Sequence, residues 1–492
     1  MPSLLRSLLA TIVGAAGLIA ASPAPGPLPQ RPNILLIVTD DQGYGDASGF
    51  APTDVETPTL DRIARAGVRF TQFRVNPLCA PTRASLLTGL DSLATGMWRG
   101  PSEPGRAEAR GKAKATAKVG RRPATEDPED STPDRGEPRR IRAGIRLLPE
   151  LLREAGYATG LFGKWHLGYA PEESPNARGF DEFVGFLGGA HPYWLRANSR
   201  LQENGGPLAA EGHTTDVFAD RAARFIRRQR DQPFFCYVAF NAVHGPLRSK
   251  EREADSALPR WLEHYAGRGL SPERRDYNAV LSHADQRIGG LLDLLGELGL
   301  TERTLVICHS DNGGITHTYP ANNGPLRGGK GQTFEGGIRV PAVAQWPGVI
   351  PAGWTSRADA AHYDLFATML AAAGLTVPAR NGSHVVQGID LLPHLRSGGQ
   401  AALPERYQFW DLYGQCGALR GPWKLVGTID NHHGRFGLAA DAAERTPFVL
   451  FNLEQDLGET RDLSAEQPVI YADLKARHVA WLRQYAETPR AR

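Results

Sequence analysis

The cysteine at position 79 lies in a stretch whose residue types suit nucleophilic chemistry or the stabilisation of an anion. The segment 76–89 reads NPLCAPTRASLLTG, with a proline two residues after Cys79 and an arginine four residues after it. Pro81 suits the first turn of a helix because its fixed φ is already helical. Cys79 is therefore expected at a helix N-terminus, where free N–H groups and the helix dipole favour negative charge, with Arg83 one turn further on to hold an oxyanion. The alternative is a cysteine that is only a small buried side chain.

Two apolar runs end in polar pairs that could hold a metal ion. Residues 33–39 and 304–310 read as buried strands of a parallel sheet, and they are followed by Asp40-Asp41 and by Asp311-Asn312. In open α/β sheets, ligands collect outside the carboxyl ends of the strands. These side chains offer only hard oxygen ligands, which suits Ca²⁺ or Mg²⁺ and argues against zinc. For a single aspartate, an acidic turn that caps a helix is the alternative.

Three further segments carry cations or titratable groups. Lys164 and His166 are two residues apart, so both would face the same way on an extended segment, where a cation beside an imidazole can bind an anion and move a proton. His244 follows the apolar run 233–240 in a Gly-Pro turn, the position of a catalytic acid. Lys330 lies in a glycine-rich stretch and could reach a bound anion as a point charge. Taken singly, each of these residues is more often structural or solvent-facing.

The elements that must position these residues alternate between apolar strands and helical patterns. This alternation predicts an α/β fold with a large central mixed, mostly parallel sheet flanked by helices. Beyond about Pro378 the pattern changes to short aromatic strands and one helix, which predicts a smaller C-terminal α+β subdomain with an antiparallel sheet. Helical spacing covers 59–66, 147–155, 218–229, 277–298, 363–373 and 469–485, and further strands are expected at 68–73, 233–240, 342–347, 407–412, 418–425 and 448–452.

The domain limits follow from length and composition. A chain of 492 residues exceeds one ordinary core, so we expect a large domain at 31–377 and a subdomain at 378–492. Residues 1–24 combine a basic start, a short apolar run and small residues, as in a secretory signal peptide, which predicts a secreted or periplasmic protein without stable membrane insertion. Residues 99–146 are rich in Lys, Arg, Pro and Gly, and they predict a disordered insertion.

Charge and cysteine content exclude several classes of protein. The formal net charge of +3 is small for this length and does not point to nucleic acid as a partner. Four cysteines, at positions 79, 236, 308 and 416, are too few for a disulfide scaffold and allow at most one disulfide among Cys236, Cys308 and Cys416.

The pattern Cys79-x-Pro81-x-Arg83 followed by ASLLTG resembles the signature of the type I sulfatases, and GLFGKWHLG at 160–168 resembles a second signature of that family. The likeness extends over about 33–375. It implies an alkaline-phosphatase-like fold and the hydrolysis of sulfate from a sulfated carbohydrate or an aryl sulfate. It also implies that a formylglycine-generating enzyme oxidises Cys79 to formylglycine (3-oxoalanine), whose hydrate attacks sulfur.

The resemblance implies a role for each matched residue. Arg83 and Lys164 would stabilise the hydrate and the charge beside the metal, and His166 would assist loss of the covalent sulfate. His244 and Lys330 would lie on the substrate side, with His244 as the acid for the leaving alcohol. Together with the modified Cys79, the ligands of Ca²⁺, or of Mg²⁺, would be Asp40, Asp41, Asp311 and Asn312.

Two other functions stay open at this stage. A phosphonate or phosphodiester hydrolase of the same superfamily would share the metal site and the nucleophile. A homologue whose cysteine is never modified would keep the fold without the activity. Substrate specificity is expected from loops at 191–204, 248–268 and 317–327, where Trp194, Arg196, His317 and Arg327 could contact a sugar or an aryl group.

Overall fold

The computed structural model describes residues 31–101, 139–196, 199–247, 256–316, 319–412, 414–428 and 436–486. The predicted signal peptide and residues 102–138 of the predicted insertion lie outside these ranges. The two ends of that insertion are described, and Ile141 and Ile145 are buried in the core. Ile141 and Ile145 therefore belong to the packed core, although the sequence pattern had placed them inside a disordered insertion that ends at position 146.

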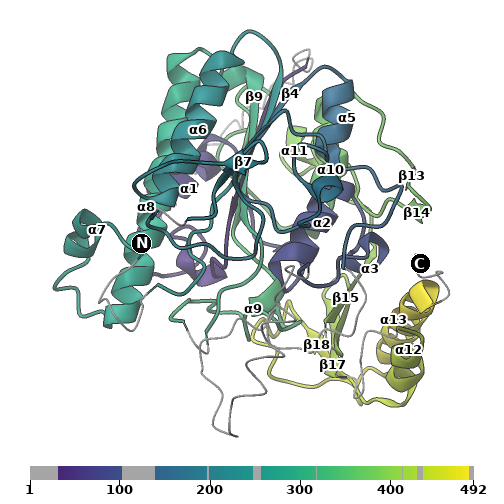
Figure 1. Cartoon of the computed structure of the whole chain (residues 1–492). Helices are drawn as coiled ribbons and strands as arrows, with labels where there is room; N and C mark the ends of the chain where they lie inside the picture. Colours follow the sequence, from purple (N-terminus) through teal and green to yellow (C-terminus); the bar gives the residue numbers. More distant parts are fainter. Residues whose placement is uncertain are drawn as a thin grey trace, which may run out of the picture.

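Within the described residues, ten strands form one sheet that runs through the larger part of the molecule (Figure 1). In chain order they are β1 (Asn33–Thr39), β2 (Val68–Phe70), β4 (Ala158–Lys164), β5 (Glu182–Phe186), β6 (Gln202–Glu203), β7 (Gly206–Pro207), β8 (Phe234–Ala239), β9 (Thr304–Ser310), β10 (Ala342–Gln345) and β11 (Trp354–Ser356). Their order across the sheet is β11-β2-β10-β9-β1-β8-β4-β5-β6-β7. The central strands β9, β1, β8, β4 and β5 pair in parallel, whereas β10 is antiparallel to both of its neighbours. This is the mixed, mostly parallel sheet that the sequence predicted.

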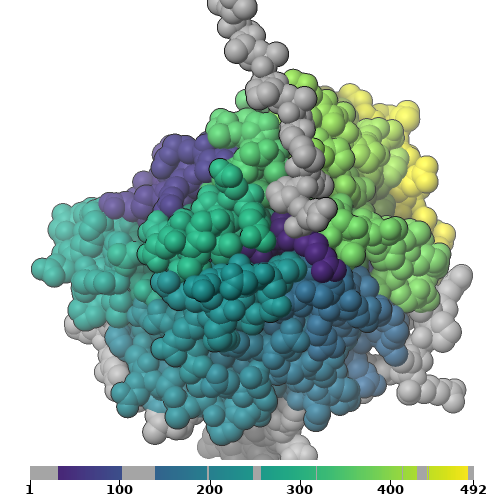
Figure 2. Space-filling view, turned by 90° about the horizontal axis from the view of Figure 1, so that it is seen from above, coloured from purple at the N-terminus to yellow at the C-terminus, as the bar shows by residue number. Residues whose placement is uncertain are grey.

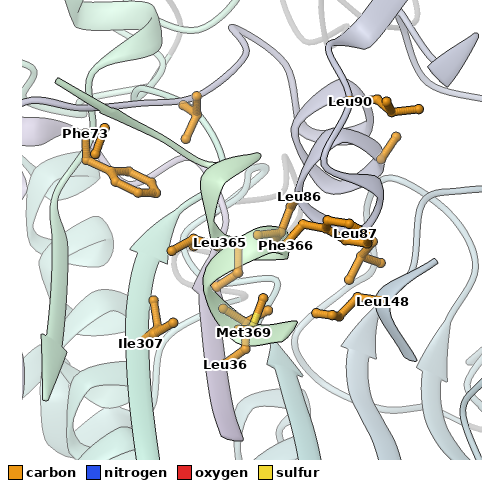
Figure 3. Close-up of a cluster of buried hydrophobic side chains, with 14 of the residues drawn as sticks. Leu36, Phe73, Leu86, Leu87, Leu90, Leu148, Ile307, Leu365, Phe366 and Met369 are labelled. Atoms are coloured by element: carbon orange, nitrogen blue, oxygen red, sulfur yellow. The ribbon is translucent and has the colours of Figure 1, made fainter. Parts of the chain in front are cut away.

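Helices cover both faces of this sheet. One face carries α1 (Pro58–Ala66), α6 (Thr214–Arg228) and α8 (Pro272–Glu297), and the other carries α2 (Cys79–Thr88), α5 (Leu148–Glu154) and α10 (Asp364–Ala372) (Figure 1). Alternate residues of β1 enter the two separate core layers, with Leu35 on one side and Leu36 on the other. In Figure 3, Leu36 lies among side chains that include Leu87 of α2 and Met369 of α10. Burial on both faces explains why this strand is a continuous apolar run and does not alternate.

The C-terminal subdomain contains a second, antiparallel sheet. Its four strands are β15 (Tyr407–Leu412), β16 (Gln415–Arg420), β17 (Trp423–Thr428) and β18 (Val449–Asn452), paired in that order. The helices α12 (Phe436–Arg445) and α13 (Pro468–Ala486) lie beside it (Figure 1). The predicted single strand 418–425 is wrong, because the chain turns at Gly421, with φ of 54°, and forms a hairpin instead. The helix α12 was not predicted.

Short elements complete the described chain. The helices α3 (Ser92–Thr95), α7 (Pro259–His264), α9 (Glu335–Ile338) and α11 (Leu392–Arg396) are one or two turns long. Short strands are β3 (Phe73–Arg74), β12 (Ala360–Ala361), β13 (Arg380–Asn381) and β14 (His384–Val385), and 3-10 turns lie at Tyr44–Asp46, Pro171–Glu173 and Thr301–Arg303. The predicted strand 68–73 is therefore two pieces, β2 and β3. All four cysteines are free and buried, so no disulfide joins Cys236, Cys308 and Cys416.

The parallel strands fix where a site can lie. The strand β1 begins at Asn33, two residues after the described chain starts. Figure 2 shows this start of the chain in dark purple, in the middle of one face, so the amino end of β1 lies near that face. The neighbouring parallel strands begin at the same end of the sheet, and their carboxyl ends meet at the opposite end. Among the described residues, no helix is both long enough and apolar enough to cross a membrane.

Candidate active site

Cys79 is the first residue of α2, as the sequence predicted. The preceding residue, Leu78, has an extended backbone and caps the helix, and the side chain of Thr82 accepts a hydrogen bond from the backbone N–H of Asn76. Every residue of α2 is buried. The Cys79 Sγ lies 3.3 Å from Asp40 Oδ1 and 3.9 Å from Asp41 Oδ1. The helix thus delivers its amino end, and the cysteine, to the carboxyl end of β1.

The two polar pairs predicted from the sequence meet at this point. Asp40 and Asp41 follow β1, while Asp311 and Asn312 follow β9, the strand that pairs with β1 in parallel register. Asp41 is linked to both partners, since its N–H donates to Asp311 Oδ1 at 3.3 Å and its Oδ1 accepts from Asn312 Nδ2 at 2.7 Å. Asp41 has a φ of 61°, a left-handed conformation that is uncommon for residues other than glycine. Strained backbone of this kind concentrates at functional sites.

Two buried cations pair with the acidic cluster, by which we mean the carboxylates of Asp40, Asp41 and Asp311. Lys164, the last residue of β4, places its Nζ 2.8 Å from Asp40 Oδ2. Arg83 donates from Nη2 and Nε to Asp311 Oδ2 at 2.7 and 3.0 Å, and from Nη1 to the carbonyl of Lys164. The sequence placed the paired donors of Arg83 beside Cys79, whereas the structure directs them to Asp311. Arg83 therefore offsets negative charge in the cluster by pairing with Asp311.

His244 and Lys330 meet on another side of Asp41. The Lys330 Nζ lies 3.0 Å from Asp41 Oδ1 and 3.4 Å from His244 Nε2, and His244 Nε2 lies 3.7 Å from Asp41 Oδ2. The Nδ1 of His244 is hydrogen bonded to the carbonyl of Gly245 at 2.7 Å, so Nε2 is the nitrogen that faces the site. The hydroxyl of Tyr193 donates to the carbonyl of His244 and holds this turn.

His166 is buried near the end of β4, but its conformation differs from the one predicted. The strand ends at Lys164, and His166 has a φ of 60°, so the two side chains are not two alternate residues of one extended segment. Its ring lies against Gly189, where an added Cβ would come within 2.8 Å of Nε2. A side chain at position 189 would therefore require this ring to shift.

The charges of the cluster shift the pKa values of its members. Burial first, and then Asp311, raise the pKa of Asp40 to about 6. Burial also raises the pKa of Asp311, but Arg83 and Lys164 outweigh it and hold that pKa below its ordinary value. The pKa of the Cys79 thiol is raised well above its ordinary range by burial and by Asp311 and Asp40. Without a bound cation, a thiol in this position stays protonated at neutral pH, which does not favour action as a thiolate nucleophile.

The residues present fit a bound Ca²⁺. Asp40, Asp41, Cys79 and Asp311 each offer a ligand atom, and these atoms lie within 4.8 Å of one another. Among the described residues, the buried Oδ1 of Asn312 has no hydrogen-bond partner, which is the condition expected of an oxygen that faces a cation. A cation would also relieve the repulsion that raises the pKa of Asp40. Carboxylate and amide oxygens are the ligands that Ca²⁺ prefers.

A second group of possible ligands, His213, Asp216 and His283, is better explained as structural. The Nε2 of His213 is hydrogen bonded to the carbonyl of Ser256 at 2.8 Å, and its Nδ1 accepts from the N–H of Thr215. Asp216 is paired with His283 Nε2 at 2.9 Å and lies 3.3 Å from the guanidinium of Arg287. Since both nitrogens of His213 are engaged and a cation already faces Asp216, this group does not suit a metal ion.

Several residues of the site lay outside the sequence predictions. Tyr237 on β8 receives a hydrogen bond from Arg83 at 3.4 Å, and Asn323 holds the glycine-rich stretch through bonds to Gly314 and Gly328. A tyrosine inside an apolar strand looks like any core aromatic residue, so no sequence signal marked it. Asn323 lies in the segment NNGPLRGGKGQ, whose turn-forming residues were the available signal.

Three of the four residues proposed for substrate contact lie among the described residues. Trp194 forms a bridge to His213 at the end of its loop, and Arg327 is exposed but already stacks on Phe334 at 4.1 Å. Arg196 is exposed, and His317 lies outside the described residues. The contribution of these four residues to substrate binding stays a prediction.

The parallel strands of the α/β sheet thus end in a buried acidic cluster with a cysteine and three cations around it, an arrangement that suits a divalent cation and an anionic substrate. Comparison with known proteins makes the assignment specific. The Sulfatase family model matches residues 32–375, so the chain belongs to the sulfatase family and is an enzyme that hydrolyses sulfate esters, as the resemblance implied.

The relatives agree with this assignment. N-acetylgalactosamine-6-sulfatase of Canis lupus familiaris is 36% identical over 418 residues, which cover 79% of this chain and 70% of that protein. Arylsulfatase A of Homo sapiens is 34% identical over 506 residues, covering 93% and 86% respectively. A solved structure of Ps i-CgsB in complex with k-i-k-neocarrahexaose is 28% identical with a TM-score of 0.74, and the match covers 94% of this chain and 95% of that chain.

Proposed function

We propose that this enzyme removes sulfate from a sulfated carbohydrate by means of a formylglycine made from Cys79 and a bound Ca²⁺. The observation that carries the proposal is the position of Cys79, which lies at the start of α2, fully buried, 3.3 Å from an acidic cluster. Its thiol is unsuited to act as a nucleophile, because its pKa is raised. A residue fixed in this place and inert as a thiol fits a chemical modification that supplies a different nucleophile.

The chain's own residues account for the remaining requirements of sulfate ester cleavage. When present, the formylglycine hydrate supplies the attacking oxygen and Ca²⁺ polarises the sulfate oxygens. We assign the metal ligands to Asp40, Asp41, Asp311 and Asn312, with residue 79.

The cations divide into two groups. Lys164 and Arg83 are fully buried and paired with Asp40 and Asp311, so they offset the charge of the cluster and keep its carboxylates ionised. Lys330 stands on another side of Asp41, where its ammonium can hold a sulfate oxygen as negative charge develops. His166, buried beside Gly189, is assigned to the loss of sulfate from residue 79.

His244 is placed to protonate the leaving alcohol. Its Nδ1 is hydrogen bonded to the carbonyl of Gly245, which directs Nε2 towards Lys330 and Asp41. A histidine with one nitrogen fixed and the other facing the reacting group can deliver a proton from a defined atom. The role of His244 is thus that of the general acid.

The class of substrate is proposed from the relatives. N-acetylgalactosamine-6-sulfatase and the carrahexaose complex of Ps i-CgsB are both named for sugars. The maturation partner would be a formylglycine-generating enzyme, and the predicted signal peptide would direct the chain to a secreted or periplasmic location.

Turnover of matched esters tests the proposal. The enzyme, produced together with a formylglycine-generating enzyme, is expected to hydrolyse sulfated oligosaccharides and an aryl sulfate, and Cys79→Ala is expected to abolish both activities. Cys236→Ala, a buried cysteine on β8 away from the cluster, is the matched control and keeps its turnover. A faster reaction with the phosphodiester of the same leaving group would favour the phosphonate or phosphodiester hydrolase, and full sulfatase turnover by Cys79→Ala would refute the scheme.

A further inference from the structure

A buried lysine of the C-terminal sheet holds the segment that carries Lys330. We call residues 327–337 the Lys330 loop. Lys424 lies on β17 without solvent exposure, and its Nζ is 2.9 Å from Glu335 Oε1 and 2.9 Å from Glu459 Oε1. Glu335 is the first residue of α9 and stands near the end of the loop. One ammonium of the subdomain is therefore clamped between the Lys330 loop and a second buried carboxylate.

The same part of the subdomain contacts the loop through three further hydrogen bonds. Glu459 accepts the N–H of Glu335 on Oε2 at 2.7 Å, and its backbone carbonyl accepts from Arg327 at 2.5 Å. The hydroxyl of Thr333 donates to the carbonyl of Cys416 on β16 at 3.1 Å. Glu459 has a φ of 53°, a strained left-handed backbone that persists only where its surroundings hold it. The loop is thus anchored to the subdomain at both ends and near its middle.

The loop in turn lies directly on the active site. The N–H of Lys330 donates to the carbonyl of Gly314 at 3.1 Å, and the N–H of Gly331 donates to the carbonyl of Pro77 at 2.8 Å. The N–H of Gly313, next to Asn312, donates to the carbonyl of Gly337 at 3.1 Å. A Cβ at Gly313 would lie 1.8 Å from the carbonyl oxygen of Gly336, so the two backbones touch. A shift of the loop must therefore move Lys330 relative to the cysteine segment.

The pKa values of Glu335 and Glu459 depend on Lys424. Burial raises the pKa of Glu335, but Arg74, followed by Lys424 and Arg339, holds it below its ordinary value. The pKa of Glu459 is raised by burial and by Glu335, while Lys424 lowers it. Without the ammonium, Glu335 keeps its pairing with Arg74, whose Nη2 lies 2.9 Å from Oε2, but Glu459 loses the cation that lies 2.9 Å from its Oε1. The repulsion between the two buried carboxylates then favours a shift of the Lys330 loop.

We propose that Lys424 is a positioning residue for the sulfatase reaction, which places Lys330 by clamping Glu335 and Glu459. The proposal rests on the proposed role of Lys330 as a cation for the substrate sulfate. It means that the C-terminal subdomain fixes part of the catalytic geometry of the larger domain, although Lys424 touches neither substrate nor metal. Displacements of about 1 Å in such a group can lower rates by about 100-fold.

A double-mutant cycle on the full-length enzyme tests this coupling. Lys424→Met is expected to lower kcat/KM for an aryl sulfate by about 10-fold to 100-fold in the wild-type background and by less than about twofold in the Lys330→Ala background. Lys424→Arg, which keeps the cation, is expected to recover part of the loss. Lys475→Met removes a lysine of the same subdomain whose Nζ donates to the carbonyl of Thr446 at 2.8 Å, and this control keeps wild-type kcat/KM. An equal loss from Lys424→Met in both backgrounds would overturn the proposal.

Hydrogen exchange separates this inference from the proposed function. Peptides that cover 327–337 are expected to exchange faster in Lys424→Met than in Lys475→Met or the wild type, whatever the role of Lys330 in turnover. Glu459→Gln, which preserves the shape of the side chain, provides a milder variant if Lys424→Met does not fold, and its exchange is expected to rise in the same peptides. Unchanged exchange at 327–337 would refute the positioning role. A Lys330→Ala enzyme with full activity, together with faster exchange in Lys424→Met, would refute only the proposed role of Lys330.

Discussion

Replacing Lys164 by methionine should destabilise the metal-free protein in a way that depends on pH. Lys164 Nζ and Asp40 Oδ2 are 2.8 Å apart, and neither side chain is exposed. Methionine fills a similar volume but leaves the carboxylate of Asp40 without its nearest cation. Loss of one partner of a buried pair costs about 3 to 5 kcal/mol. Because Asp40 can escape part of this cost by taking up a proton, we expect a loss of about 3 kcal/mol at the alkaline end of the range.

The sign of the pH dependence follows from Asp40. Its pKa in the folded protein is raised from 3.8 to about 6, first by burial and then by Asp311, while Lys164 lowers it. Removing Lys164 raises this pKa further. A carboxyl with a folded pKa above its unfolded value gives stability that is complete below the unfolded pKa and is lost as the pH rises through the folded pKa. The deficit of Lys164→Met should therefore grow from about pH 5 to about pH 8.

Urea unfolding with a chelator present, at both ends of this pH range, measures the effect. The double variant Asp40→Asn with Lys164→Met removes the buried charge as well as its partner, so most of the deficit at high pH should disappear. Lys475→Met is the control for loss of a partly buried lysine that does not face the cluster. A deficit that is independent of pH, or one that Asp40→Asn does not relieve, would refute the electrostatic reasoning.

Three further predictions concern the metal, the general acid and the subdomain. Ca²⁺ at about 100 times its Kd should stabilise the protein by about 2.7 kcal/mol in thermal unfolding. Asn312→Ala should weaken this stabilisation, because the variant lacks the Oδ1 that we assign as a ligand. Equal stabilisation of the variant and the wild type would show that Asn312 is not a ligand. His244→Gln should lower kcat by about 100-fold or more for alkyl sulfates and much less for an aryl sulfate with an acidic leaving group, and an equal loss for both would exclude proton donation by His244. Asp91→Ala should lower the free energy of unfolding in urea by about 1 to 3 kcal/mol, because Asp91 caps α3 and accepts hydrogen bonds from Trp481 and Tyr485 of α13. A decrease below about 0.5 kcal/mol would show that this contact contributes little to stability.

The strands and the residues at their ends could be predicted from the sequence because the signal is local. The runs that became β1, β8 and β9 are continuous and apolar, and each one ends in polar residues that the parallel sheet must bring to one edge. The helix start at Cys79 was also local, since Pro81 marks its first turn. For these elements, burial on both faces and the limited conformation of proline leave few alternatives.

The contacts that depend on long-range geometry could not be predicted. The position of Arg83 in the sequence does not show whether its guanidinium faces Cys79 or Asp311, and in the structure it is paired with Asp311. The two-residue spacing of Lys164 and His166 predicted that both side chains face the same way on an extended segment, but the left-handed backbone of His166 means that the segment is not extended there. Lys424 and Glu459 look like solvent-facing charges in the sequence, and only the packing of β17 against the Lys330 loop buries them together. The hairpin at Gly421 was missed because one glycine and proline pair was read as part of a strand.

The most direct test of the central claim is a mass spectrum of the peptide that contains residue 79, taken from active enzyme produced with a formylglycine-generating enzyme. We predict that the residue is formylglycine in a fraction of molecules that rises in proportion to sulfatase turnover across preparations. An enzyme that hydrolyses sulfate esters at full rate while residue 79 is an unmodified cysteine throughout would contradict the claim.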